Sequence, residues 1–155
     1  MNTSNIKKYA PQARNDFIAA MRKQAAKYGI TADSILPAEQ KGDLLLIGDQ
    51  VFSLSVMKSR EKLIKRIQTS SFEQTIDYIA YSWFNRLCAI RYMECKGLLD
   101  HGRRVLSSAD GSAGLPQILE ECLDIDLPGL DASRVAELKL DGNKDEELYR
   151  ELLLA

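Results

Sequence analysis

The feature that most constrains the fold is one long run of helical periodicity between Phe72 and Lys96. Apolar side chains recur there at spacings of three and four residues, and they spread so widely around the axis that one face alone cannot hold them. Ser70 or Ser71 is suited to cap the start of this helix, and Gly97 is suited to end it. We therefore expect a central, mostly buried helix over residues 72–96.

Shorter elements are expected on the N-terminal side of this helix. Apolar spacing predicts helices over residues 10–28 and 57–69. Two apolar runs separated by Gly48-Asp49 predict a β-hairpin over residues 43–54 with a two-residue type II′ turn. Residues 31–42 have no sustained period and are interpreted as a loop.

The C-terminal part of the chain differs in composition from the preceding part. Residues 107–114 are rich in Ser and Gly and predict a flexible loop, which is followed by an acidic helical tail over residues 115–155. Short helices are expected near residues 116–123, 131–140 and 144–155, with Asp131 and Asn143 as N-caps and Gly142 as a stop. The fold class we predict is mainly α, a helical bundle around one long buried helix at about 72–96 with a small β-hairpin at about 43–54.

Length and hydropathy limit the kind of protein further. A chain of 155 residues matches one ordinary domain, and we expect residues 1–155 to form a single domain. The apolar runs are far shorter than the roughly 20 residues that span a bilayer. The first residues lack the apolar stretch of a signal peptide. We therefore expect a cytoplasmic protein that does not contact a membrane.

Charge is distributed unevenly along the chain. Residues 1–70 hold 12 Lys and Arg against 6 Asp and Glu, whereas residues 101–155 hold 6 against 12. On the helix expected at 57–69, Lys58, Lys62, Lys65 and Arg66 share one side, which favours contact with a phosphate backbone. A solvated helix face is the alternative interpretation. The candidate DNA-binding residues are Lys58, Arg60, Lys62, Lys65, Arg66, Arg22 and Lys23.

Catalytic and metal-binding patterns are missing from the sequence. It has no phosphate-binding or dinucleotide-binding glycine motif, and its single histidine, His101, has no recognisable nucleophile beside it. We expect no catalytic residue and no metal ligand in this segment. The three cysteines are interpreted as buried small hydrophobic residues; they are Cys88, Cys95 and Cys122.

Two arginines stand out within the long helix as structural polar residues. Arg91 has Glu94 three residues later, whereas Arg86 has no acidic residue at the helical neighbour positions. Because a largely buried guanidinium needs a partner, we expect Arg86 to reach a carboxylate, a carbonyl or a ligand phosphate from elsewhere.

A resemblance to a known family rests on three stretches. The longest is Tyr81-Ser82-Trp83-Phe84-Asn85-Arg86-Leu87-Cys88-Ala89-Ile90-Arg91-Tyr92-Met93-Glu94, followed by Gly97-Leu98-Leu99-Asp100-His101-Gly102-Arg103-Arg104-Val105-Leu106-Ser107. The others are the opening residues 1–14 and residues 145–154. Together they resemble the N-terminal region of PglX-type adenine-specific DNA methyltransferases from BREX phage-defence systems.

The resemblance implies that this chain is the N-terminal part of a longer enzyme that methylates adenine N6 at specific DNA sites. It also implies that the glycine-rich loop for S-adenosylmethionine and the Asn-Pro-Pro-Tyr motif lie downstream, since neither occurs here. The apolar end at residues 152–154 likewise favours a chain cut from a longer protein. We expect this segment to be catalytically inert and to bind no cofactor of its own.

Two roles remain open for the segment. In the first, its basic face contacts the DNA backbone. In the second, it is a protein–protein docking or scaffold module with no DNA contact of its own. The expected partners are the downstream methyltransferase domain, DNA, and other phage-defence components.

Overall fold

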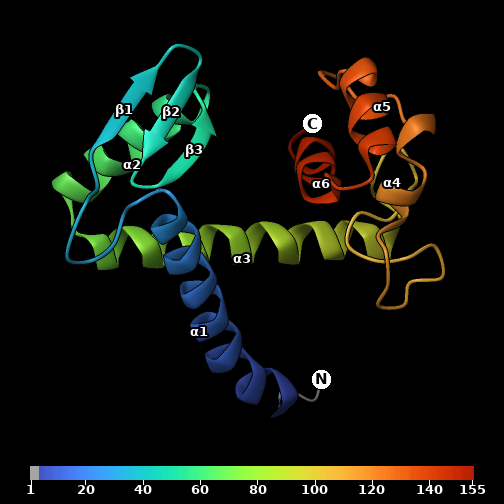
Figure 1. Ribbon diagram of the computed structural model, residues 1–155. Helices are drawn as coiled ribbons and strands as arrows, with labels where there is room; N and C mark the ends of the chain where they lie inside the picture. Colours follow the sequence, from blue (N-terminus) through green and yellow to red (C-terminus); the bar gives the residue numbers. More distant parts are fainter. Residues whose placement is uncertain (1–3) are drawn as a thin grey trace. The chain divides into compact units, whose positions relative to one another are not determined.

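The computed structural model describes residues 4–155, with side chains described from residue 7 onward, and it divides the chain into two compact units. Unit 1 runs to Asn85 and unit 2 begins at Arg86, so helix α3 (Phe72–Lys96) contributes to both (Figure 1). The remaining elements are α1 (Ser4–Lys27), β1 (Ala38–Lys41), β2 (Leu44–Ile47), β3 (Gln50–Ser53), α2 (Val56–Thr69), α4 (Gln117–Glu120), the 3₁₀ turn η1 (Cys122–Asp124), α5 (Ala132–Asp141) and α6 (Asp145–Leu154). The predicted mainly α class with a small β element is confirmed.

Unit 1 places a three-helix core beside a small sheet. Ala25, Ile30 and Ile76 are buried at its centre, and apolar side chains of all three helices pack around them. The predicted hairpin is present as β2 and β3, joined by Gly48 and Asp49. Gly48 has φ of 57° and no non-glycine residue described has positive φ, which is the sign pattern of the expected type II′ turn.

A third strand, β1, corrects the prediction of a loop over residues 31–42. Its four residues are all exposed, so they carry no apolar alternation, and β1 pairs with β2 in antiparallel register from Ala38↔Ile47 to Lys41↔Leu44. Helix α1 also begins earlier than residue 10, so Pro11 lies inside it rather than in its first turn.

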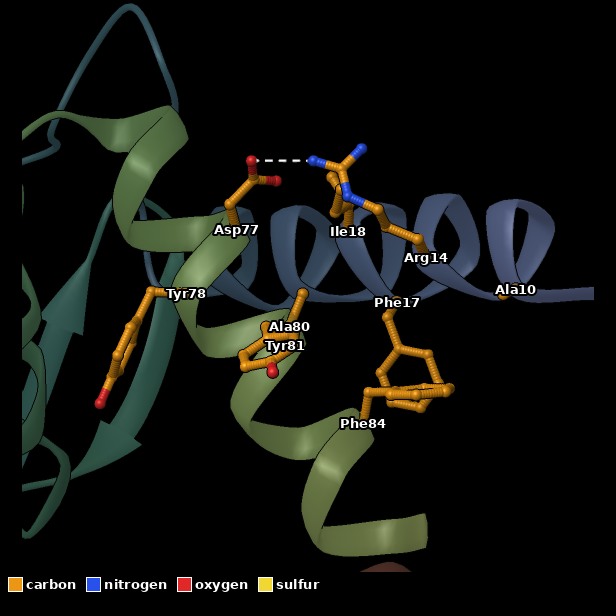
Figure 2. A pocket seen from close by; sticks show the side chains of 9 residues that line it. All are labelled: Ala10, Arg14, Phe17, Ile18, Asp77, Tyr78, Ala80, Tyr81 and Phe84. Carbon is orange, nitrogen blue, oxygen red and sulfur yellow. Dashed lines mark hydrogen bonds and ion pairs between the residues drawn. The ribbon is translucent and has the colours of Figure 1, made fainter. Parts of the chain in front are cut away.

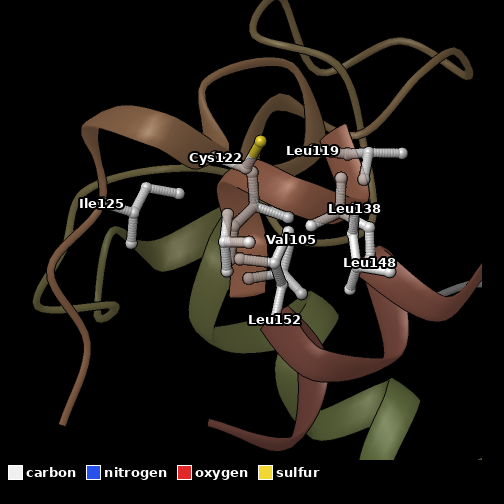
Figure 3. Packing of buried hydrophobic residues seen from close by; sticks show 9 residues of the cluster. Val105, Leu119, Cys122, Ile125, Leu138, Leu148 and Leu152 are labelled. Atoms are coloured by element: carbon white, nitrogen blue, oxygen red, sulfur yellow. The ribbon is translucent and has the colours of Figure 1, made fainter. Parts of the chain in front are cut away.

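Unit 2 has its own apolar core, made mainly by the short helices that follow α3 (Figure 3). Asp131 caps α5 as expected, since its Oδ1 accepts hydrogen bonds from Ser133 N at 3.0 Å and Arg134 N at 3.1 Å. Gly142 ends α5, but Lys144 rather than Asn143 precedes α6. The buried core residues are Val105, Ile118, Leu119, Cys122, Ile125, Val135, Leu138, Leu148 and Leu152.

Helix α3 has the predicted bounds but is much less buried than expected. Its buried residues are Thr75, Ile76 and Ala80 near the start and Glu94 near the end, and none of residues 81–93 is buried. The two cores draw on different ends of the helix, and the residues between them are half-buried or exposed. Cys88 and Cys95 are exposed, contrary to the prediction, whereas Cys122 is buried as predicted.

The buried carboxylate of Glu94 organises the segment that follows α3. It accepts hydrogen bonds from Val105 N at 2.8 Å, Leu106 N at 2.7 Å and Ser107 Oγ at 2.6 Å, and it pairs with Arg91. Since the side chain of Glu94 is 0% exposed, these donors replace the water that it loses on folding. The turn at residues 105–107 is thereby fixed to the last turns of α3.

Replacing Glu94 with Gln should destabilise the protein by about 2 kcal/mol, because charge-assisted hydrogen bonds to a buried acceptor are lost or weakened. Urea unfolding at pH 7 measures this change. Glu120→Gln, at an exposed position, is the matched control and should change little. Equal effects of the two substitutions would contradict the assigned role of Glu94.

The same cluster predicts a pH dependence. Burial acts to raise the pKa of Glu94, but hydrogen bonds from Leu106, Ser107, Arg91 and Val105 outweigh it, and the net effect lowers that pKa. The carboxylate therefore stabilises the fold above the unfolded-state pKa of about 4.3, and this contribution disappears as the pH falls through the lower folded-state pKa. The stability difference between wild type and Glu94→Gln should be constant from about pH 7 to 5 and shrink below about pH 4, as followed by unfolding curves.

Candidate nucleic-acid interface

Helix α2 places its exposed cations on the side opposite its apolar residues. Leu63, Ile64 and Ile67 pack against the core of unit 1. The exposed cations on the other side recur at helical spacing, and they are Lys58, Lys62, Lys65 and Arg66. We call these four residues the α2 basic face. Its location agrees with the sequence analysis.

The charges of the α2 basic face are not neutralised within the part of the chain that the structure describes. The ion pairs of unit 1 are Arg14–Asp77, Arg22–Glu73 and Lys41–Glu39, and none of them involves this face. Arg66 lies over the ring of Tyr78, with 3.8 Å between its Cζ and the ring centroid. This cation–π contact orients the guanidinium without cancelling its charge. Within the described residues the face therefore presents four cations that make no ion pair, and Glu61 is the one acidic residue of α2.

Arg60 was assigned to the same exposed group, but the structure places it inside. It is only 7% exposed, its Nε donates to Tyr28 O at 2.9 Å, and its guanidinium also donates to Leu36 O. Burial lowers the pKa of Arg60. Since Arg60 precedes Leu63, Ile64 and Ile67 by three, four and seven residues, helical geometry alone puts it on their face. That spacing is the signal that sequence reasoning missed.

The two candidates on α1 differ from each other. The Arg22 guanidinium pairs with the Glu73 carboxylate of α3, so its charge is balanced. Lys23 is exposed. No described contact joins either residue to the α2 basic face.

The two arginines of α3 also differ. Arg91 pairs with Glu94, as the three-residue spacing suggested, and its Nη1 donates to Ser107 Oγ at 2.9 Å. Arg86 is exposed in the middle of the helix, so its expected burial is wrong, but it is not without an interaction partner. The reason for its exposure is the low burial of residues 81–93.

An apolar groove of about 470 Å³ lies between α1 and α3 in unit 1 (Figure 2). Phe17 and Phe84 meet edge to face in it, with ring centroids 5.7 Å apart and an interplanar angle of 89°. Tyr78 and Tyr81 also line the groove and are 53% and 68% exposed. Sequence reasoning assigned these aromatic residues to a core, because it assumed that α3 was buried.

The described residues offer little for catalysis or cofactor binding. Within residues 4–155 no group of three His, Cys, Asp or Glu side chains is placed to hold a metal ion. His101 stabilises a turn, because its Nδ1 accepts a hydrogen bond from Arg103 N at 3.2 Å. A pocket in unit 2 contains Glu94, but that carboxylate is occupied by its four donors and is not free to bind ribose hydroxyls. This pocket therefore offers no free carboxylate at Glu94 for the ribose of S-adenosylmethionine.

In the described part of the chain, no helix combines the length and apolar character that a bilayer crossing requires.

Known methyltransferases are similar to this chain, although no family model matches it. It is 47% identical, over 99% of its own length, to the adenine-specific methyltransferase BrxX of Escherichia coli O9:H4 (strain HS). The chain is similar to a small part of the PglX-type adenine-specific methyltransferases. It is also 30% identical, over 81% of its length, to the adenine-specific methyltransferase PglX of Lacticaseibacillus casei (strain Zhang).

These matches confirm the resemblance seen in the sequence, and they also limit it. The chain spans 13% of the length of the BrxX protein and 11% of the length of the PglX protein. Most of each methyltransferase therefore lies outside the matched region.

The different roles of Arg60 and Lys62 on α2 can be tested by measuring the unfolding free energy of variants. Arg60→Ala should destabilise the protein by about 3 kcal/mol, because the backbone carbonyls of Tyr28 and Leu36 lose a charged donor and the packing of the buried Arg60 stem is lost. Lys62→Ala, at an exposed position two residues later, should change the unfolding free energy by less than about 0.5 kcal/mol. Chemical denaturation of both variants is the measurement. A stable Arg60→Ala variant would show that Arg60 is not part of the core.

Proposed function

We propose that this chain is the non-catalytic N-terminal domain of a site-specific adenine-N6 DNA methyltransferase of phage defence, and that the α2 basic face contacts the DNA backbone. The parent enzyme would act in the cytoplasm, with S-adenosylmethionine bound by a downstream domain. The observation that carries the DNA contact is the set of exposed cations at Lys58, Lys62, Lys65 and Arg66, which make no ion pair with the described residues.

The spacing of these cations suits a phosphate backbone. Lys58 and Lys65 are seven residues apart, or about 10.5 Å along the helix axis, and neighbouring phosphates of one strand advance about 3.4 Å along the DNA axis. Long flexible lysine side chains can reach successive phosphates from one helix face. Each neutralised phosphate releases condensed counterions, which makes the binding dependent on salt.

The same chemistry limits what the face can read. Phosphate contacts fix the position and orientation of a protein on DNA but carry no base sequence. The α2 basic face would therefore hold DNA for the parent enzyme, while selection of the target site would lie in the remainder of that enzyme. Arg66 is oriented by its contact with the ring of Tyr78.

Neutralising the face should weaken DNA binding in a characteristic way. The triple variant Lys58→Gln, Lys62→Gln, Lys65→Gln should bind a short duplex more weakly at low salt, and the slope of log K against log salt should become smaller by about 2 to 3. Fluorescence anisotropy at several salt concentrations measures both quantities.

The matched control removes the same charge elsewhere. Lys41→Gln, Lys144→Gln and Arg150→Gln alter exposed cations that lie outside α2, and together they should leave the salt slope unchanged. An equal loss in both triple variants would show that net charge alone controls binding. Wild-type binding that does not respond to salt would exclude the backbone contact.

A second candidate function is docking, and the groove between α1 and α3 favours it. A partly exposed apolar groove of this size is suited to receive apolar side chains from a protein partner. The occupant we propose is a segment of the parent methyltransferase outside this chain, because the relatives extend far beyond the matched region.

Docking can be tested at Tyr81, which lines the groove and is 68% exposed. Tyr81→Ser should change the stability of the 155-residue chain little but should lower the thermal stability of the full-length parent, since a covered contact is lost. Tyr92→Ser is the control, because Tyr92 is 61% exposed on the same helix and does not line the groove. Equal melting temperatures of the two full-length variants would count against docking at this groove.

A further inference from the structure

Unit 2 contains a polar pocket of about 390 Å³ at the end of α3. This is the pocket that contains Glu94, and Arg103 and Arg104 line it together with Gly102, Ala109 and Gln117. These two arginines belong to the run that carries the resemblance in sequence, and neither the α2 basic face nor the apolar groove uses them. Its volume lies within the range of small-ligand sites, roughly 300–1,000 Å³.

The backbone holds Arg104 firmly in the wall of this pocket. Its N donates to Gln117 Oε1 at 3.0 Å, and its carbonyl accepts a hydrogen bond from Ile118 N at 2.9 Å. Its guanidinium packs against Gly111, where a Cβ atom would come within 3.3 Å of Cζ and Nη1. Gly111 therefore leaves the space that this side chain occupies.

Arg104 is half-buried, and within the described residues its guanidinium has no acidic partner. No buried side-chain nitrogen or oxygen in the described part lacks a hydrogen bond, so any guanidinium nitrogen without a protein partner must reach solvent. The side chain thus presents unused donors at a pocket wall. A cation in such a position is ready to bind an anion.

The acidic groups nearby are all engaged with other donors. Glu121 accepts hydrogen bonds from Arg103 Nε at 2.8 Å and Gln117 Nε2 at 3.0 Å. Glu94 is paired with Arg91. Asp110 accepts from Ser108 Oγ at 2.6 Å and Ser112 N at 2.9 Å, and these bonds lower its pKa to about 2. None of these three carboxylates makes a described ion pair with Arg104, so the guanidinium donors of Arg104 stay available.

We propose that this pocket binds a phosphate group, with Arg104 as the principal ligand and Arg103 as its neighbour. The planar guanidinium offers a fork of parallel N–H donors that matches two oxygens of one phosphate. Arg103 keeps its Nε on Glu121, which orients its terminal nitrogens. The site would be a second anion contact, in the other unit from the α2 basic face.

The choice of phosphate over carboxylate rests on the proposed function, because a DNA methyltransferase meets phosphates on its substrate. The same chemistry is available from a DNA phosphodiester and from free phosphate. The two sources are separated by the ligand used in the test.

The experiment is an NMR titration of the 155-residue chain with inorganic phosphate, sodium acetate and a short DNA duplex in separate arms. Phosphate should shift the Arg104 Nε–H signal and the Gly102 and Gly111 amides, with a Kd on the order of 1 mM. Acetate should shift them much less. Arg104→Gln should remove the response, Arg104→Lys should weaken it several-fold, and Arg150→Gln on the exposed face of α6 should leave it intact.

Each outcome decides the proposal. Shifts of these signals by phosphate support it, and the same shifts with the duplex identify DNA as the source. Equal shifts with acetate, or none with phosphate and duplex, would overturn it. The titrations of the wild-type chain are sufficient to test the proposal, so a misfolded Arg104→Gln variant would not prevent a conclusion. The α2 triple variant reports on the proposed DNA contact separately, so failure of one does not imply failure of the other.

Discussion

Both units are organised by a buried charge that must be satisfied by the backbone. In unit 1 the Arg60 guanidinium donates to carbonyls of Tyr28 and Leu36, and it thereby joins α2 to the end of α1 and the segment that follows. In unit 2 the Glu94 carboxylate accepts the N–H groups of Val105 and Leu106 and holds the turn after α3. Removing a charge from water is costly, so each group stabilises the fold only in the one arrangement that supplies its partners.

The same constraint explains why the cations of α2 lie on different sides of the helix. On α2 it takes Arg60 into the core and leaves Lys58, Lys62 and Lys65 on the opposite side with no described ion pair. Cations that make no contact in the core remain available to bind an anionic partner. The similarity to adenine-specific methyltransferases makes DNA the natural choice for that partner in our proposal.

Local signals predicted much of the fold, and tertiary context explains the failures. The bounds of α3, the turn at Gly48 and the Asp131 cap follow from periodicity and short-range hydrogen bonding. Strand β1 was missed because its exposed polar residues depend on pairing with β2. The burial of α3 was overestimated because a wide apolar distribution was taken for one core, whereas the two cores use opposite ends of the helix. Arg60 was predictable from its spacing to Leu63.

The central claim is the proposal that the α2 basic face contacts a phosphate backbone. The most direct measurement is to map amide chemical-shift changes of the 155-residue chain on adding duplex DNA, first at low and then at high salt. The account predicts changes in unit 1 centred on residues 58–66 that fade as salt rises. Changes that persist at high salt, or a titration that leaves α2 unaffected, would contradict it.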